Sequence, residues 1–123
     1  MRLLLFIGIG SFVGGVLRYL TAQWVQGKFL SAFPFGTLGV NIAGCLAIGL
    51  VFGLSERSSL PMEWRLFLAT GLCGGFTTFS AFSNETLALL RDGQYGYAAT
   101  YVVASVLLGL LATFIGFTII KIL

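Results

Sequence analysis

Polar side chains inside otherwise apolar stretches are the residues of this sequence that could do chemistry. The densest group is residues 70–85, in which Gly74 and Gly75 are soon followed by Thr77 and Thr78. Glycine and threonine are poor helix formers, so this run predicts a helix that is interrupted near its middle. Backbone carbonyls freed in an apolar environment must bind protein, water or an ion, and converging carbonyls suit a bare alkali cation. The alternative is an unbroken helix whose glycines permit a tight helix crossing.

Two phenylalanines follow the threonines. Phe79 and Phe82 are three residues apart and therefore share one face of a helix. The edge of a phenyl ring is positive, so ring edges can line a path for an anion without binding it strongly. Because the chain contains 12 phenylalanines, ordinary packing is the simpler interpretation of this pair taken alone.

Uncharged hydrogen-bonding groups occur in the neighbouring apolar segments. The amide of Asn41 can donate to an anion or hydrogen-bond to another helix. Tyr101, Ser105 and Gly109 recur every four residues and form one stripe, which we expect to face a neighbouring helix or a path rather than lipid. Ser80 lies on the helix face next to that of the phenylalanine pair.

Arg18 and Glu85 are the ionisable residues expected within or at the rim of the apolar segments. Charges at membrane depth are functional candidates. Arg18 could attract anions to a vestibule or extend to the membrane surface. Glu85 could border a vestibule or hydrogen-bond to a partner group.

The sequence lacks the residues that several kinds of chemistry require. The chain has no histidine, and Cys45 and Cys73 do not have the spacing of a zinc or redox site. No nucleophile and base pair is recognisable, which argues against an enzyme. No acidic residue lies in the first, second or fourth apolar segment, which argues against a proton-driven cation exporter. The remaining groups suit passive passage of a small anion.

The elements that position these groups are four apolar segments, at approximately residues 3–25, 36–54, 63–90 and 95–121. Each is near or above the ~20 residues that a helix needs to cross a bilayer. The chain has 123 residues, of which 58% are hydrophobic and 9% charged, whereas soluble domains carry about 25% charged residues. We therefore expect a single all-α transmembrane domain rather than a soluble enzyme or a nucleic-acid binder. A signal peptide is the alternative for the first segment.

The distribution of basic residues predicts how the chain inserts. Four lie on the side of both termini and three on the other side, so Lys and Arg hardly bias the orientation. Weak orientation and dual topology, with copies inserted both ways up, both remain open. Glycines at four-residue spacing, such as Gly10 and Gly14, could support an oligomer or pack helices within one chain.

Residues 74–85, GGFTTFSAFSNE, resemble the signature GGxTTFSTFSxE of the dual-topology fluoride channels, the Fluc or CrcB family. Supporting matches are GGVLRY at residues 14–19 and GTLGVNIAG at residues 36–44. The similarity extends over the whole chain in length, number of spans and motif order. Ala81 departs from the pattern, because the family usually has threonine there, and this removes a hydroxyl beside Phe82.

The resemblance implies an antiparallel homodimer with two fluoride pathways in the bacterial plasma membrane, exporting fluoride passively. It also implies a structural sodium ion at the dimer centre, bound by the carbonyls of Gly74 and Thr77. By position in the motifs, the implied pathway residues are Phe79, Phe82, Asn41, Ser80, Tyr101 and Ser105, and the implied vestibule residues are Arg18 and Glu85.

Two other functions remain as alternatives. A small proton-coupled multidrug exporter has the same size and number of spans, but it needs a carboxylate in its first helix, where this chain has Arg18. A scaffold subunit of a larger membrane complex is the non-transport alternative.

Overall fold

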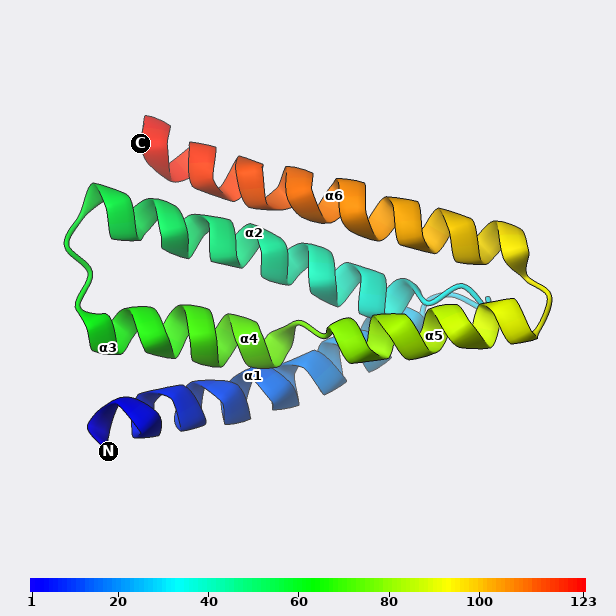
Figure 1. Ribbon diagram of the computed structural model, residues 1–123, viewed down its shortest axis with the longest axis horizontal. Coiled ribbons are helices and arrows are strands. Elements are labelled where there is room, and N and C mark those ends of the chain that lie inside the picture. The colour runs from blue at the N-terminus through cyan, green and yellow to red at the C-terminus, as the bar shows by residue number, and fades with distance from the viewer.

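The computed structural model describes residues 1–123 and consists of four long helical spans without strands (Figure 1). Three spans are single helices, α1 (Arg2–Gln26), α2 (Phe35–Arg57) and α6 (Tyr95–Ile122). The other extends from Met62 to Arg91 and contains several elements, and all four spans are long and apolar enough to cross a membrane. The predicted all-helical, four-span class is confirmed.

The third span is interrupted. Its first half comprises α3 (Met62–Arg65), a wider π-helical segment, η1 (Leu66–Cys73), and the single turn α4 (Gly74–Phe76). Thr77 and Thr78 then have extended backbones, with ψ angles of 158° and 118°, and α5 (Phe79–Arg91) begins directly after them. Figure 1 shows this break as the thin, non-helical segment of chain between α4 and α5.

The break lies at the threonines and not at the paired glycines. Gly74 and Gly75 are still helical, so within the run of glycines and threonines that predicted the interruption only the threonines leave the helix. A β carbon on Gly75 would lie 2.6 Å from the Ser11 carbonyl oxygen, and one on Gly71 would lie 2.9 Å from that of Ile7. These glycines therefore let the third span approach the backbone of α1, which is the tight crossing that the sequence left as the alternative.

This crossing predicts which glycine of the adjacent pair Gly14 and Gly15 tolerates alanine. A β carbon on Gly14 would press on the Leu72 carbonyl and lie 2.9 Å from the Phe76 nitrogen, whereas one on Gly15 would meet nothing within 4 Å. We expect Gly14→Ala to lower stability by about 1–3 kcal/mol, as overpacking does, and Gly15→Ala to leave it unchanged. Thermal unfolding in detergent measures both, and equal unfolding temperatures would contradict the close crossing.

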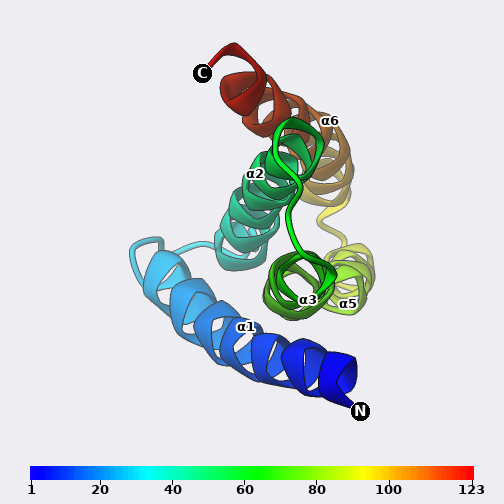
Figure 2. The ribbon, with the colours of Figure 1, turned by 90° about the vertical axis from the view of Figure 1, so that its left-hand side faces the viewer.

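Glycines also bring α2 and α6 together. A β carbon on Gly49 would lie 3.0 Å from the Phe117 nitrogen, and one on Gly116 would lie 2.9 Å from that of Leu50. Viewed end on, α6, α2 and α1 form a curved row, and the third span lies against one side of it (Figure 2). The third span contacts α1 and α2 and, through α5, also α6, and the break lies beside Asn41 and Gly44 in the first half of α2.

Candidate functional site

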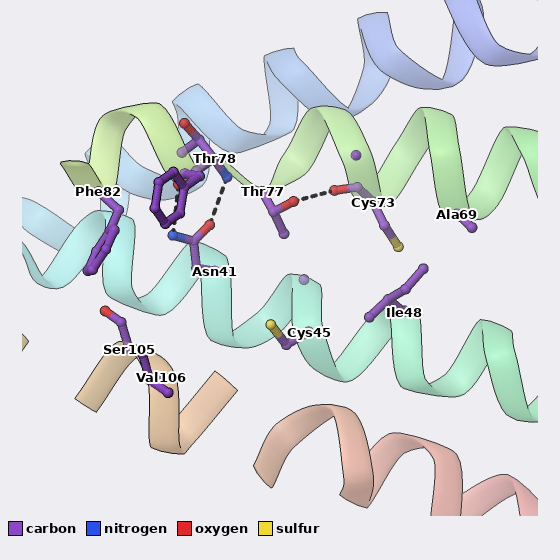
Figure 3. Close-up of a pocket in the computed structure, with 13 residues that line it drawn as sticks. Asn41, Cys45, Ile48, Ala69, Cys73, Thr77, Thr78, Phe82, Ser105 and Val106 are labelled. Atoms are coloured by element: carbon purple, nitrogen blue, oxygen red, sulfur yellow. Dashed lines mark hydrogen bonds between the residues drawn. The ribbon is translucent and has the colours of Figure 1, made fainter. Parts of the chain in front are cut away.

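Asn41 on α2 satisfies the backbone of the break. Its Oδ1 accepts from the Thr78 N–H at 2.8 Å, and its Nδ2 donates to the Thr78 carbonyl at 3.1 Å (Figure 3). The Thr78 hydroxyl accepts from the Ala81 N–H at 3.0 Å and so caps α5. Asn41 and Thr78 therefore hold the two helix halves apart in a defined geometry.

The backbone carbonyls at the end of the first half of the span differ in whether they accept a hydrogen bond. The Gly75 carbonyl accepts from Arg18 Nε at 3.1 Å. The Thr77 carbonyl accepts no hydrogen bond. The Gly74 carbonyl is also free, because the N–H groups that would reach it in a continuous helix bond elsewhere. The Thr77 N–H donates to the Cys73 carbonyl, and the Thr78 N–H donates to Asn41. Two of the carbonyls next to the break thus retain their lone pairs.

Arg18 contacts the break directly. The guanidinium places a positive charge at the carbonyl end of the first half of the span, where the helix dipole is negative. Sequence reasoning offered Arg18 as a vestibule residue or as one that extends to the membrane surface, and the structure adds a hydrogen bond from its guanidinium to the Gly75 carbonyl.

A cavity of about 450 Å³ lies between the break, α2 and α6 (Figure 3). It brings together most of the residues that the sequence singled out. Ser105 Oγ is buried there without a hydrogen-bond partner, so it is available to a ligand. The predicted residues that line the cavity are Asn41, Gly74, Thr77, Phe79, Phe82 and Ser105.

Two of the predicted pathway residues, Ser80 and Tyr101, lie outside this cavity. Ser80 is exposed, and its hydroxyl is 3.2 Å from that of Thr78. Tyr101 is fully buried behind Phe82, with the ring centroids 5.0 Å apart. Tyr101 and Gly109 are both buried, so the stripe on α6 faces the protein, and Tyr101 contacts the cavity only through Phe82.

Glu85 lies at the centre of a small hydrogen-bonded group. Its carboxylate accepts from the Thr37 hydroxyl at 2.9 Å and from the Tyr101 hydroxyl at 2.8 Å. Glu85 also lines a second cavity of about 250 Å³ together with Gln26 and Asp92. Sequence reasoning missed Thr37, although it lies four residues before Asn41 and therefore on the same face of α2.

Phe82, Tyr101 and Glu85 form a chain of contacts between the two cavities. The larger cavity is bounded by Phe82, Phe82 packs on Tyr101, and Tyr101 bonds to Glu85, which faces the second cavity. Hydroxyl and amide groups can replace the water around an ion without transferring a proton. The protein is a multi-pass membrane protein with an interrupted span beside a mainly apolar cavity that contains a few amide and hydroxyl groups, an arrangement associated with ion pathways.

Comparison with known proteins identifies the family. Residues 5–117 match the model of the family described as CrcB-like protein, Camphor Resistance (CrcB), and the chain belongs to the CrcB family. It is 47% identical to "Fluoride-specific ion channel FluC" of Flavobacterium psychrophilum over 122 residues, covering 98% of both chains. It is 49% identical to the proteins of the same name from Bacteroides fragilis, over 94% of both chains, and from Thermus thermophilus, over 92% of this chain and 89% of the relative. The resemblance seen in the motifs is confirmed.

Proposed function

We propose that this protein is a passive fluoride channel of a bacterial membrane and not an enzyme. The observation that carries the proposal is identity of 47–49% to proteins named fluoride-specific ion channels, over nearly the whole chain. The four apolar spans support it, as do the amide and hydroxyl groups in the cavity beside the broken span. Passive exit through such a channel lowers fluoride in the cytoplasm.

The pathway in this proposal runs along α5. Ring edges of Phe79 and Phe82 line it, and the unpartnered Ser105 hydroxyl donates to the ion. Asn41 uses one N–H on Thr78, and its second N–H is available for an anion. Beyond Phe82, the hydroxyls of Tyr101 and Thr37 exchange their bonds to Glu85 for bonds to the passing ion.

The functional unit in this proposal is an antiparallel homodimer. Phe79 is 78% exposed, Ser80 is exposed, and the extended residues Thr77 and Thr78 are only half-buried. Irregular backbone and hydroxyl groups are not tolerated against lipid, so another protein surface must cover the break. A second copy inserted the other way up would cover it with the same residues and would close the open side of the cavity.

A sodium ion fits the free carbonyls. The carbonyl oxygens of Gly74 and Thr77 accept no hydrogen bond within the chain. Oxygen ligands suit a hard cation. An alkali cation would offset the partial negative charge at this end of the half-helix and help to hold two copies together. If so, exchanging sodium for N-methylglucamine should weaken the dimer in crosslinking and sedimentation measurements, and unchanged dimer stability would exclude this role.

The test of the function is efflux from liposomes that contain only this protein. We expect a fluoride-selective electrode to record rapid release and a chloride electrode to record none. Release of both ions would contradict the selectivity. Proton-dependent uptake of a lipophilic cation would instead identify a multidrug exporter, and absence of all flux would favour a scaffold subunit.

A further inference from the structure

The connection between α1 and α2 holds none of the predicted pathway residues, although Gln26 at its start lines the second cavity, and several hydrogen bonds hold it in place. Gln26, the last residue of α1, donates from Nε2 to the Phe33 carbonyl at 3.1 Å and to the Ser31 carbonyl at 3.4 Å. Its Oε1 accepts from the Gly36 N–H at 2.8 Å. One side chain therefore satisfies a free N–H in the first turn of α2, which has no side-chain cap of its own, and fixes the backbone of Phe33.

The fixed backbone places the Phe33 side chain inside the protein. Phe33 is 6% exposed although it belongs to a loop. Its ring meets that of Tyr101 edge to face, with centroids 5.6 Å apart and an interplanar angle of 77°. Phe82 packs on the same Tyr101 ring at 5.0 Å. Tyr101 therefore lies between a loop residue and a residue of the cavity wall.

The packing of Phe33 on Tyr101 matters because the Tyr101 hydroxyl must stay where it can bond to Glu85. The hydroxyl donates to Glu85 Oε1 at 2.8 Å, and a hydrogen bond weakens steeply when its angle or length changes. Tyr101 is 0% exposed, so its ring keeps its tilt only while the packing around it is complete. Removal of the Phe33 ring would leave a void that the Tyr101 ring could move into.

We propose that Phe33, held by Gln26, is a positioning residue that fixes Tyr101 between Phe82 and Glu85. This assignment rests on the proposed function for its effect on flux, but the positioning itself is independent of the ion that is carried. The wall between the two cavities consists of Phe82, Tyr101 and Glu85, so the loop sets the geometry of passage between them. The α1–α2 connection is then part of the channel machinery and not only a link between spans.

The first experiment compares fluoride efflux for three substitutions. We expect Phe33→Leu to slow efflux by about tenfold, the effect of roughly 1.4 kcal/mol on the barrier, because leucine cannot meet the Tyr101 ring. Phe33→Tyr retains the ring and should restore efflux. Phe29→Leu is the matched control, since Phe29 is 44% exposed and stacks on Phe35 rather than on Tyr101. Equal efflux from Phe33→Leu and Phe29→Leu would overturn the proposal.

The second experiment measures the position of Tyr101 without any flux. The infrared difference between the protein and its Tyr101→Phe variant isolates the hydrogen-bonded phenol of Tyr101 among the four tyrosines of the chain. We expect this band to shift in Phe33→Leu and to stay in place in Phe29→Leu and Phe33→Tyr. An unshifted band in Phe33→Leu would overturn the positioning role even if fluoride efflux is slowed. Absence of efflux from the unmodified protein would instead contradict the proposed function.

A double-mutant cycle separates positioning from general destabilisation. If Phe33 acts through Tyr101, then Phe33→Leu should add little to the loss of efflux already caused by Tyr101→Phe. Multiplication of the two effects would show that Phe33 acts elsewhere and would overturn the proposal.

Discussion

Replacement of Phe82 with isoleucine is expected to slow fluoride efflux by at least about tenfold. Isoleucine fills part of the volume but has no positive ring edge, so an ion that has lost water beside it gains nothing in return. It also removes the ring that packs on Tyr101 at 5.0 Å. Each ~1.4 kcal/mol lost at the barrier slows passage tenfold, and both losses fall on the same step. Efflux from liposomes with equal amounts of reconstituted protein measures the effect.

Phe79→Ile extends this prediction to the proposed dimer. Phe79 lies 5.5 Å from Phe82 between ring centroids but is 78% exposed in the single chain. A loss of efflux similar to that of Phe82→Ile is expected only if a second copy covers Phe79 and closes the path. Phe12→Ile is the control, because Phe12 is exposed on α1 away from the cavity. Undiminished efflux from both pathway variants would contradict their assignment.

Replacement of Asn41 with alanine is expected to destabilise the break and to abolish efflux. The Asn41 amide bonds to both the N–H and the carbonyl of Thr78, and no helical partner is in reach because the backbone there is extended. An unsatisfied buried polar group costs about 1–3 kcal/mol, and because the Thr78 backbone is only half-buried, we expect the two unpaired groups together to cost about that much. Thermal unfolding in detergent, size-exclusion profiles and efflux should all report the loss.

Two further variants sharpen this prediction. Asn41→Asp keeps the acceptor for the Thr78 N–H but places a carboxylate oxygen against the Thr78 carbonyl and a charge at membrane depth, so its stability should be no higher than that of Asn41→Ala. Asn84→Ala is the control, since Asn84 is exposed on α5 and forms no hydrogen bond through its side chain. A normal unfolding temperature for Asn41→Ala would show that the break does not depend on this amide.

The interruption of the third span illustrates how far pattern reasoning reaches. Glycines and threonines within residues 70–85 predicted a break, and a break is present. The pattern did not say which of these residues leave the helix: Gly74 and Gly75 remain helical, and only Thr77 and Thr78 are extended. A glycine permits both a break and a close helix crossing, and the neighbouring backbone of α1 decides between them.

The candidate site shows a similar limit. The residue types that the sequence singled out do gather beside the break, but Arg18 and Tyr101 make contacts that their spacing does not indicate. Arg18 bonds to a residue 57 positions away, and Asn41 to one 37 positions away. Sequence reasoning did not single out Phe33 or Gln26, because a loop phenylalanine and a glutamine at a helix end are common and form no recognisable motif. It also missed Thr37, for which the four-residue spacing to Asn41 was the one available signal.

The sequence alone determined that the chain crosses the membrane in four helices, because apolar segment length and composition decide partition into lipid, and it placed the densest group of polar residues in the third span. The motifs also sufficed to indicate the family. Only the tertiary structure decided which carbonyls stay free and which residues support Tyr101. Such pairings depend on how close the helix backbones approach and at what register, and these follow from the packing of all spans together.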